Sequence, residues 1–214
     1  MKLVCITGID GTGKSTLARN AVAALKQQGV AATYMYGRTY PLISRLLMAL
    51  GRMVLLRKRD IWLDYRGYTA SKKQTMRNPL LARLYTAAIL ADYYVQVWLK
   101  LVPHMFGGRV VIADRYLYDT VISDLAVHLN YSAEQTERAI KRGLGLVPAP
   151  ALTVLIDVPP EVAFARKDDV PHVDYLSERR EWYLRLRSRP EVITFDGQRP
   201  PDELVQALLQ AVQT

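Results

Sequence analysis

The chain has 214 residues, half of them apolar and 23% charged, which is ordinary globular composition and argues against a disordered protein. We expect one domain over residues 1–214, because this length can bury a substantial core and the sequence contains no repeat or linker. The net charge of +9 favours an anionic partner or substrate, and nucleotides, nucleic acid and anionic membranes all meet that condition.

Short β-rich runs alternate with helical patterns along the chain. We expect strands at 2–7, 31–36, 109–113, 152–156 and 192–195. We expect helices at 14–28, 42–56, 80–102, 132–142, 161–167, 176–187 and 201–212. Because helices separate the strands and hairpin signals are lacking, this order predicts an α/β fold whose parallel sheet is covered on both faces. Ligands of such folds bind beyond the carboxyl ends of the strands.

Two features of the sequence predict the cellular location of the protein. Cys5, the single cysteine, has no partner for an internal disulfide, and no signal peptide is recognisable, so we expect a reducing, cytoplasmic setting. The long apolar stretch 80–102 carries Arg83, Asp92 and Lys100, so we expect a buried helix there and no membrane span.

A phosphate-binding motif follows the first strand. Residues 8–15 read GIDGTGKS, which matches G-x-x-x-x-G-K-[ST] in the strand-to-helix context that the motif requires. Glycines let backbone N–H groups surround a phosphate at the positive end of a helix, and an ordinary glycine-rich turn is the weaker alternative. Lys14 is expected to reach the β- and γ-phosphates of ATP, and the Ser15 hydroxyl to bind Mg²⁺. The residues expected to bind ATP here are Gly8, Ile9, Asp10, Gly11, Thr12, Gly13, Lys14, Ser15 and Thr16.

A second motif ends the strand expected at 109–113. Asp114 stands where a parallel strand would place a carboxylate beside the Mg²⁺, although a strand that merely ends in a polar residue is common. Arg115 follows directly, and its guanidinium is suited to hold the phosphate of a second substrate through two hydrogen bonds. We therefore expect Ser15 and Asp114 at the metal.

With residues 8–16 and the triplet DRY at 114–116, the chain resembles the thymidylate kinase family. The likeness continues through LIDVPPE at 155–161, YLRL at 183–186, FDG at 195–197 and PDEL at 201–204, in the family's order, but does not cover about 40–90. The resemblance implies a P-loop NTPase three-layer sandwich with five parallel strands. It also implies transfer of the ATP γ-phosphoryl group to a nucleoside monophosphate, with dTMP as the leading acceptor.

The resemblance assigns further roles. Asp10 would meet the sugar hydroxyl of the acceptor, and Arg38 and Arg115 would hold its phosphate. The adenine would be surrounded by Arg166 and by the loop containing Asp196, Gly197 and Gln198. The expected catalytic residues are Lys14, Asp10, Arg115 and Arg166. In the tyrosine-rich stretch 85–98, most aromatic side chains are expected in the core, and Tyr93 is expected to face the acceptor.

The chain departs from the family in two places. Gly11 stands where some members carry an arginine that stabilises the transferring charge, so we expect a mobile lid near 165–175 to bring a cation such as Arg166. The family's arginine for the thymine base would align near 91–94, where the chain has none. The acceptor therefore stays open between dTMP, another pyrimidine nucleotide, a nucleoside and a different small phosphate ester.

Other interpretations carry less weight. A nucleotide-dependent switch or nucleic-acid-binding NTPase would suit the pI of about 9.7, but the guanine-reading N-K-x-D pattern is missing and we expect no stable nucleic-acid partner. The basic stretch 42–59 reads better as a solvated helix flank than as a membrane-surface helix. His104, His128 and His172 lack metal-ligand spacing, and we assign them no role. A homodimer is one candidate assembly.

Overall fold

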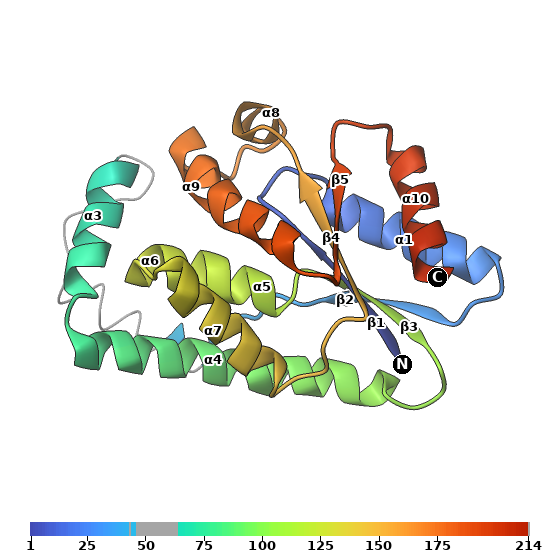
Figure 1. The fold of residues 1–214 in the computed structure, drawn as a ribbon, viewed down its shortest axis with the longest axis horizontal. Coiled ribbons are helices and arrows are strands. Elements are labelled where there is room, and N and C mark those ends of the chain that lie inside the picture. The colour runs from blue at the N-terminus through green and yellow to red at the C-terminus, as the bar shows by residue number, and fades with distance from the viewer. Residues whose placement is uncertain (43, 46–63, 214) are drawn as a thin grey trace.

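The computed structural model describes residues 1–42, 44–45 and 64–213. Five parallel strands form one sheet in the order β2-β3-β1-β4-β5 (Figure 1). The strands are β1 (Lys2–Thr7), β2 (Ala32–Tyr36), β3 (Val110–Asp114), β4 (Leu152–Asp157) and β5 (Val192–Asp196). The α/β class and the parallel five-stranded sheet that the sequence predicts are confirmed.

Helices cover both faces of this sheet. α1 (Lys14–Gln27) packs against α10 (Pro201–Gln213) on one face, and the other helices lie on the opposite face or at its upper edge (Figure 1). These are α3 (Tyr65–Thr75), α4 (Pro79–Leu101), α5 (Leu117–Asp119), α6 (Val127–Leu129), α7 (Ala133–Leu144), α8 (Pro160–Ala165) and α9 (Val173–Leu184). A π-helix (Thr120–Ala126) joins α5 to α6, and 3₁₀ turns follow α4 (Val102–His104) and α9 (Arg185–Ser188).

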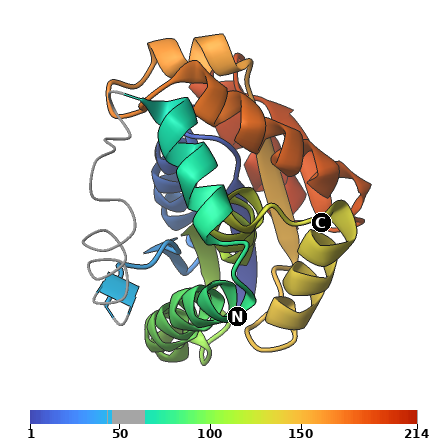
Figure 2. The same cartoon turned by 90° about the vertical axis from the view of Figure 1, so that its left-hand side faces the viewer.

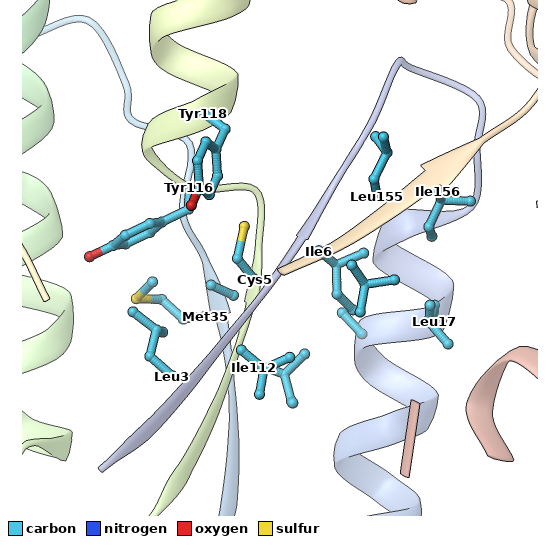
Figure 3. Close-up of a cluster of buried hydrophobic side chains, with 14 of the residues drawn as sticks. Leu3, Cys5, Ile6, Leu17, Met35, Ile112, Tyr116, Tyr118, Leu155 and Ile156 are labelled. Atoms are coloured by element: carbon cyan, nitrogen blue, oxygen red, sulfur yellow. The ribbon is translucent and has the colours of Figure 1, made fainter. Parts of the chain in front are cut away.

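The core lies on both sides of the central strand β1, which is why its sequence lacks the polar alternation of a half-exposed strand. Leu3 and Cys5 point toward the face that carries Tyr116 (Figure 3). Ile6 points to the other face, where Leu17 of α1 packs (Figure 3). All five side chains are at most 4% exposed, so Cys5 is a small core residue.

Two helical segments were not expected from the sequence. α3 buries none of its residues, so it has no apolar stripe from which a helix could be inferred. The segment from α5 to α6 has the opposite character, because nearly all of its residues from Leu117 to Val127 are buried and the π-helix interrupts the 3.6-residue period. The helix expected at 42–56 and the basic stretch 42–59 fall largely on residues 43 and 46–63, outside the described residues.

α3 stands between α9 and α4 (Figure 2). Side-chain contacts join α3 to α9. Lys73 forms an ion pair of 2.5 Å with Glu178, and the Tyr65 hydroxyl donates a hydrogen bond of 3.1 Å to the same carboxylate. Among the described residues, no helix combines the length and the apolar character that crossing a membrane requires.

The carboxyl ends of the strands bring acidic residues to one edge of the sheet. Asp114 ends β3 between Ile6 of β1 and Tyr36 of β2, and Asp157 of β4 is paired with Asp196 of β5. The loop between β1 and α1 leaves the sheet at this edge, as the sequence predicts.

Candidate active site

At two positions of the loop between β1 and α1, only glycine fits both the backbone conformation and the available space. Gly8 and Gly11 have φ angles of 141° and 87°. A Cβ atom on Gly8 would lie 2.4 Å from the carbonyl oxygen of Ile156, and one on Gly11 would lie 2.2 Å from that of Ala163. The loop is therefore pressed against the end of β4 and against α8, and position 11 has no room for a side chain.

Lys14, the first residue of α1, is folded back across the loop. Its ammonium donates hydrogen bonds to the carbonyl oxygen of Ile9 (2.5 Å) and to the Thr12 hydroxyl (3.4 Å), and the residue is 4% exposed. Burial and the nearby Arg115 lower the pKa of Lys14 to about 8, although Asp10 opposes the shift. The lysine is thus a desolvated cation at the helix end, where a phosphate would be bound.

Ser15 and Asp114 meet at the base of the loop. The Ser15 hydroxyl donates a 2.5 Å hydrogen bond to Oδ2 of Asp114, and the Tyr34 hydroxyl donates one of 2.9 Å to the same oxygen. The other oxygen, Oδ1, is buried and has no hydrogen-bond partner among the described residues. An orphaned carboxylate oxygen beside a hydroxyl suits Mg²⁺, which often takes one or two carboxylates together with waters and substrate phosphates. Within the described part of the chain, no group of three or more His, Cys, Asp or Glu residues is arranged for a metal.

Arg115 and Asp10 form an ion pair that joins the end of β3 to the loop. Burial alone would raise the pKa of Asp10, but the Arg115 and Lys14 charges overcome that effect and hold the pKa well below its usual value. Arg115 has a φ of 72°, a left-handed conformation that is uncommon outside glycine. Gly37 packs against it so closely that a Cβ would lie 1.9 Å from the Arg115 carbonyl oxygen.

Asp119 is a charged group at the site that the sequence analysis missed. It is 2% exposed and accepts hydrogen bonds from the hydroxyls of Thr7 and Tyr183, each at 2.9 Å. Its carboxylate lies 3.6 Å from the Arg115 guanidinium. Burial raises the pKa of Asp119 more than Arg115 and Lys14 lower it. No motif marks this residue; its position one turn after Arg115 is the only signal in the sequence.

Arg38 and Tyr93 lie in different surroundings. Arg38 forms an ion pair of 3.0 Å with Asp124 and borders a pocket of about 240 Å³. Tyr93 is fully buried, with its ring packed edge-on against Tyr116 at 6.1 Å. The expected placement of Tyr93 on the acceptor cleft is therefore corrected: it belongs to the core, and Tyr85 is the tyrosine of α4 that borders the Arg38 pocket.

A second pocket, of about 340 Å³, lies on the other side of the loop. Its walls come from α1, from Arg166 after α8, and from the loop that follows β5. The Arg166 guanidinium donates a 3.0 Å hydrogen bond to the Gly197 carbonyl oxygen. Asp196 does not border the pocket; its carboxylate accepts a 2.9 Å hydrogen bond from the Gln198 amide and so shapes the loop. The residues that line the pocket are Thr12, Gly13, Thr16, Leu17, Arg166, Gly197, Gln198, Arg199, Pro200, Pro201 and Leu204.

The segment expected to form a lid connects α8 to α9. Lys167 is paired with Asp169 at 2.8 Å, so Arg166 is not the partner of that carboxylate. Arg180, in α9, forms two hydrogen bonds of 2.7 and 3.0 Å with Asp157 at the end of β4. Arg187 binds the same carboxylate at 2.7 Å. Lys167, Arg180 and Arg187 are thus engaged with acidic residues, whereas Arg166 binds a backbone carbonyl.

The chain is similar in sequence to several curated thymidylate kinases. No family model matches the chain. A probable thymidylate kinase of Metallosphaera sedula is 28% identical and covers 100% of this chain and 93% of its own length. The thymidylate kinases of Carboxydothermus hydrogenoformans and Leptospira borgpetersenii are 27% and 24% identical, over 95% and 97% of this chain and 92% and 91% of theirs. The alignments thus span nearly the whole sequence: the chain is similar to thymidylate kinases along its length, and it is a phosphotransferase.

Proposed function

We propose that this protein transfers the γ-phosphoryl group of ATP to a nucleoside monophosphate, with dTMP as the leading acceptor. The observation that carries the proposal is that the loop containing Lys14 borders one pocket while Arg38 borders another. Thr12 and Gly13 of the loop border the larger pocket. Arg38, whose charge interacts with Arg115 and Asp10, borders the smaller one. A phosphoryl group could pass between two bound substrates at this edge, and the names of the curated relatives support dTMP.

On the ATP side, the loop N–H groups and the start of α1 would bind the phosphates. Lys14 would exchange its contact with the Ile9 carbonyl for the β- and γ-phosphates, where its charge is more strongly stabilised than beside a neutral carbonyl. Arg166 would lie against the adenine, because it borders the larger pocket together with Gly197 and Gln198.

Ser15 and Asp114 would hold Mg²⁺, through the serine hydroxyl and through the carboxylate oxygen that has no partner among the described residues. When bound, the ion would neutralise charge on the phosphate oxygens. Tyr34 fixes the orientation of the carboxylate by its hydrogen bond to Oδ2, so that Oδ1 stays available.

On the acceptor side, Arg115 and Arg38 would hold the phosphate, and Asp10 would accept a hydrogen bond from the sugar hydroxyl. The lowered pKa keeps Asp10 ionised at neutral pH, so the residue serves as a hydrogen-bond acceptor and orients Arg115 rather than taking a proton. Both arginines are already paired with carboxylates, which keeps these two cations in place before a phosphate arrives.

The tight contact between Gly11 and Ala163 explains why the loop supplies no arginine of its own. The remaining positive charge for the transferring phosphoryl group must therefore come from another segment, and we propose that residues 165–175 close over the substrates to bring it. Closure would also exclude water, which limits hydrolysis of ATP.

We also propose that the protein acts as a cytoplasmic homodimer. Several apolar side chains on the outward side of α4 are exposed, among them Leu84 (48%), Val95 (54%) and Leu99 (70%). Exposed apolar side chains on one helix can form an interface, and a second copy of this helix would cover these residues. Light scattering would give the molar mass in solution, and a monomer would contradict this assembly.

A kinase with another acceptor, either a different pyrimidine nucleotide or a nucleoside, is the second candidate, because the α4 positions 91–94 carry no arginine for a base. The test is an ADP-release assay with Mg·ATP and each nucleoside monophosphate or nucleoside in turn. We expect release that depends on dTMP or another pyrimidine monophosphate. Release that no acceptor accelerates would contradict the proposed function.

A further inference from the structure

The smaller pocket is bordered by His128, which has no role assigned from the sequence. This pocket of about 240 Å³ lies between α4, α3 and the helical segment after Arg115, and Arg38 stands at one side of it. Tyr85 and Ile89 of α4 supply an apolar wall, and His128 of α6 supplies an imidazole.

The polar atoms of this pocket are mostly engaged. Asp124 is paired with Arg38, and Asp92 accepts hydrogen bonds from the backbone and hydroxyl of Ser44. The Tyr85 hydroxyl donates a 3.1 Å hydrogen bond to the Asp124 carbonyl oxygen, which fixes α4 against the π-helix. In contrast, Nδ1 of His128 is buried without a hydrogen-bond partner among the described residues. A buried polar atom without a partner is uncommon in native proteins, and among the described residues that line this pocket only His128 has such an atom.

An uncommon type of helix precedes this histidine in the chain. Thr120–Ala126 form a seven-residue π-helix directly before α6. π-Helical turns occur often at functional sites, because they change which side chains of a helix face a given neighbour. Here the π-helix ends at Ala126, two residues before His128, which borders the pocket. Almost all residues of the π-helix itself are buried in the core.

The charges around His128 favour an uncharged imidazole. Burial, together with the cations Lys72, Arg179, Lys73 and Arg38, lowers the pKa of His128 well below its usual 6.5. A neutral imidazole offers one donor and one acceptor, and it recognises a neutral base without adding a further cation near Arg38.

We propose that His128 recognises the pyrimidine ring of the acceptor through a hydrogen bond, with Tyr85 and Ile89 against the ring and Arg38 on the phosphate. This inference rests on the proposed function, since the pocket binds an acceptor base only if the enzyme phosphorylates a nucleotide. It goes further by naming the residue that contacts the base and so discriminates between acceptors.

The test compares H128L and H128Q with the unchanged protein, using dTMP, dUMP, dCMP, dAMP and dGMP as acceptors. Leucine keeps the apolar volume and removes the hydrogen bond, so H128L should raise the acceptor KM about tenfold or more, the effect of one lost hydrogen bond in a buried site. The KM for ATP should stay within about twofold, because His128 borders only the acceptor pocket. Glutamine retains a donor and an acceptor, so H128Q should recover most of the affinity and change the ratio of dTMP to dCMP use.

H104L is the matched control. His104 also has a buried Nδ1 without a partner among the described residues, but it lies in the turn after α4 and does not border the pocket. Its acceptor KM should not change. An acceptor KM within twofold of normal in folded H128L would overturn the proposal, and so would an equal rise in H104L. If H128L does not fold, an unchanged order of preference in H128Q overturns it.

The same data separate this inference from the proposed function. Transfer to dAMP or dGMP in preference to every pyrimidine would overturn the role of His128 in base selection and leave a nucleotide kinase. No transfer to any acceptor by the unchanged protein would overturn the proposed function and the role of His128 with it.

Discussion

The guanidinium of Arg115 is held by the carboxylate of Asp10, which joins the end of β3 to the phosphate-binding loop. The left-handed backbone of Arg115 and the close approach of Gly37 fix the arginine from its main chain as well. Such residues persist in uncommon conformations only where the surrounding structure holds them, and they concentrate at functional sites.

Replacing Arg115 by alanine should raise the acceptor KM about tenfold or more and change the ATP KM little. The substitution removes the guanidinium proposed for the acceptor phosphate and leaves the loop that holds the triphosphate. Steady-state kinetics with both substrates varied would measure the two effects. R138A is a suitable control, because Arg138 pairs with Glu134 on the exposed side of α7. A loss of ATP affinity with normal acceptor kinetics would show that the role is wrongly assigned.

Replacing Lys14 by methionine should lower kcat by a factor on the order of 10² or more, because a preorganised charge on the transferring group is lost. The same variant should be more stable than the unchanged protein at pH 7 without nucleotide. In the folded chain the pKa of Lys14 is about 8 against a usual 10.5, so below pH 8 folding must bury its charge.

The difference in unfolding free energy between K14M and the unchanged protein should become smaller as the pH rises. Between pH 8 and 10.5 the folded protein releases the Lys14 proton while the unfolded chain retains it, so the unchanged protein gains stability relative to K14M. Urea unfolding of both proteins at pH 7 and pH 9.5 would measure this. A difference that is constant across that range would contradict the lowered pKa.

Replacing Asp114 by asparagine should raise the Mg²⁺ concentration for half-maximal activity about tenfold or more, since a neutral amide is a poorer ligand for a hard cation. Chelation of divalent ions should abolish turnover in the unchanged protein. Y34F removes only the hydroxyl that orients the carboxylate and should show a smaller effect. Calorimetry of Mg²⁺ binding in the presence of ATP gives a reading independent of turnover. Equal Mg²⁺ requirements in D114N and the unchanged protein would exclude Asp114 as a ligand.

Replacing Gly11 by alanine should abolish ATP binding or unfold the loop, whereas G29A should be tolerated. Both glycines have positive φ angles, 87° and 77°, so both variants carry the cost of a left-handed alanine, about 1–2 kcal/mol. At Gly11 the new Cβ would also collide with the backbone oxygen of Ala163, at a distance of 2.2 Å. At Gly29 no atom lies within 4 Å of the new Cβ. Binding of a fluorescent ATP analogue and thermal unfolding would compare them. Normal ATP affinity in G11A would contradict the tight packing on α8.

Replacing Arg166 by alanine should raise the ATP KM more than it lowers kcat. The sequence analysis favours a catalytic lid arginine, but Arg166 borders the larger pocket and donates to the Gly197 carbonyl oxygen, which supports the adenine contact that the family resemblance also implies. R180A offers the comparison, because Arg180 lies on α9 and is bound to Asp157. A normal ATP KM with a much reduced kcat in R166A would restore the catalytic role.

The sequence predicted the sheet and the P-loop well because both depend on local patterns. Strands buried on both faces read as continuous apolar runs, and the loop requires fixed residues at fixed spacing. α3 escaped prediction because it packs through polar contacts such as Lys73 with Glu178, which leave no apolar period.

Burial near the smaller pocket was harder to predict, because it depends on packing between distant segments. Tyr93 and Tyr85 stand on the same helix and both are buried, and their different surroundings come from distant segments: Tyr93 packs on Tyr116, and Tyr85 binds the Asp124 carbonyl. Asp119 and His128 likewise acquire their surroundings from residues far along the chain, such as Thr7 and Lys72.

The most direct test of the account is transfer of labelled phosphate from [γ-³²P]ATP to dTMP by the purified protein with Mg²⁺. Chromatography should show label in dTDP that grows with time, that requires dTMP, and that K14M reduces by a factor on the order of 10² or more. Label that appears only as inorganic phosphate, at a rate that no nucleoside monophosphate changes, would contradict the account.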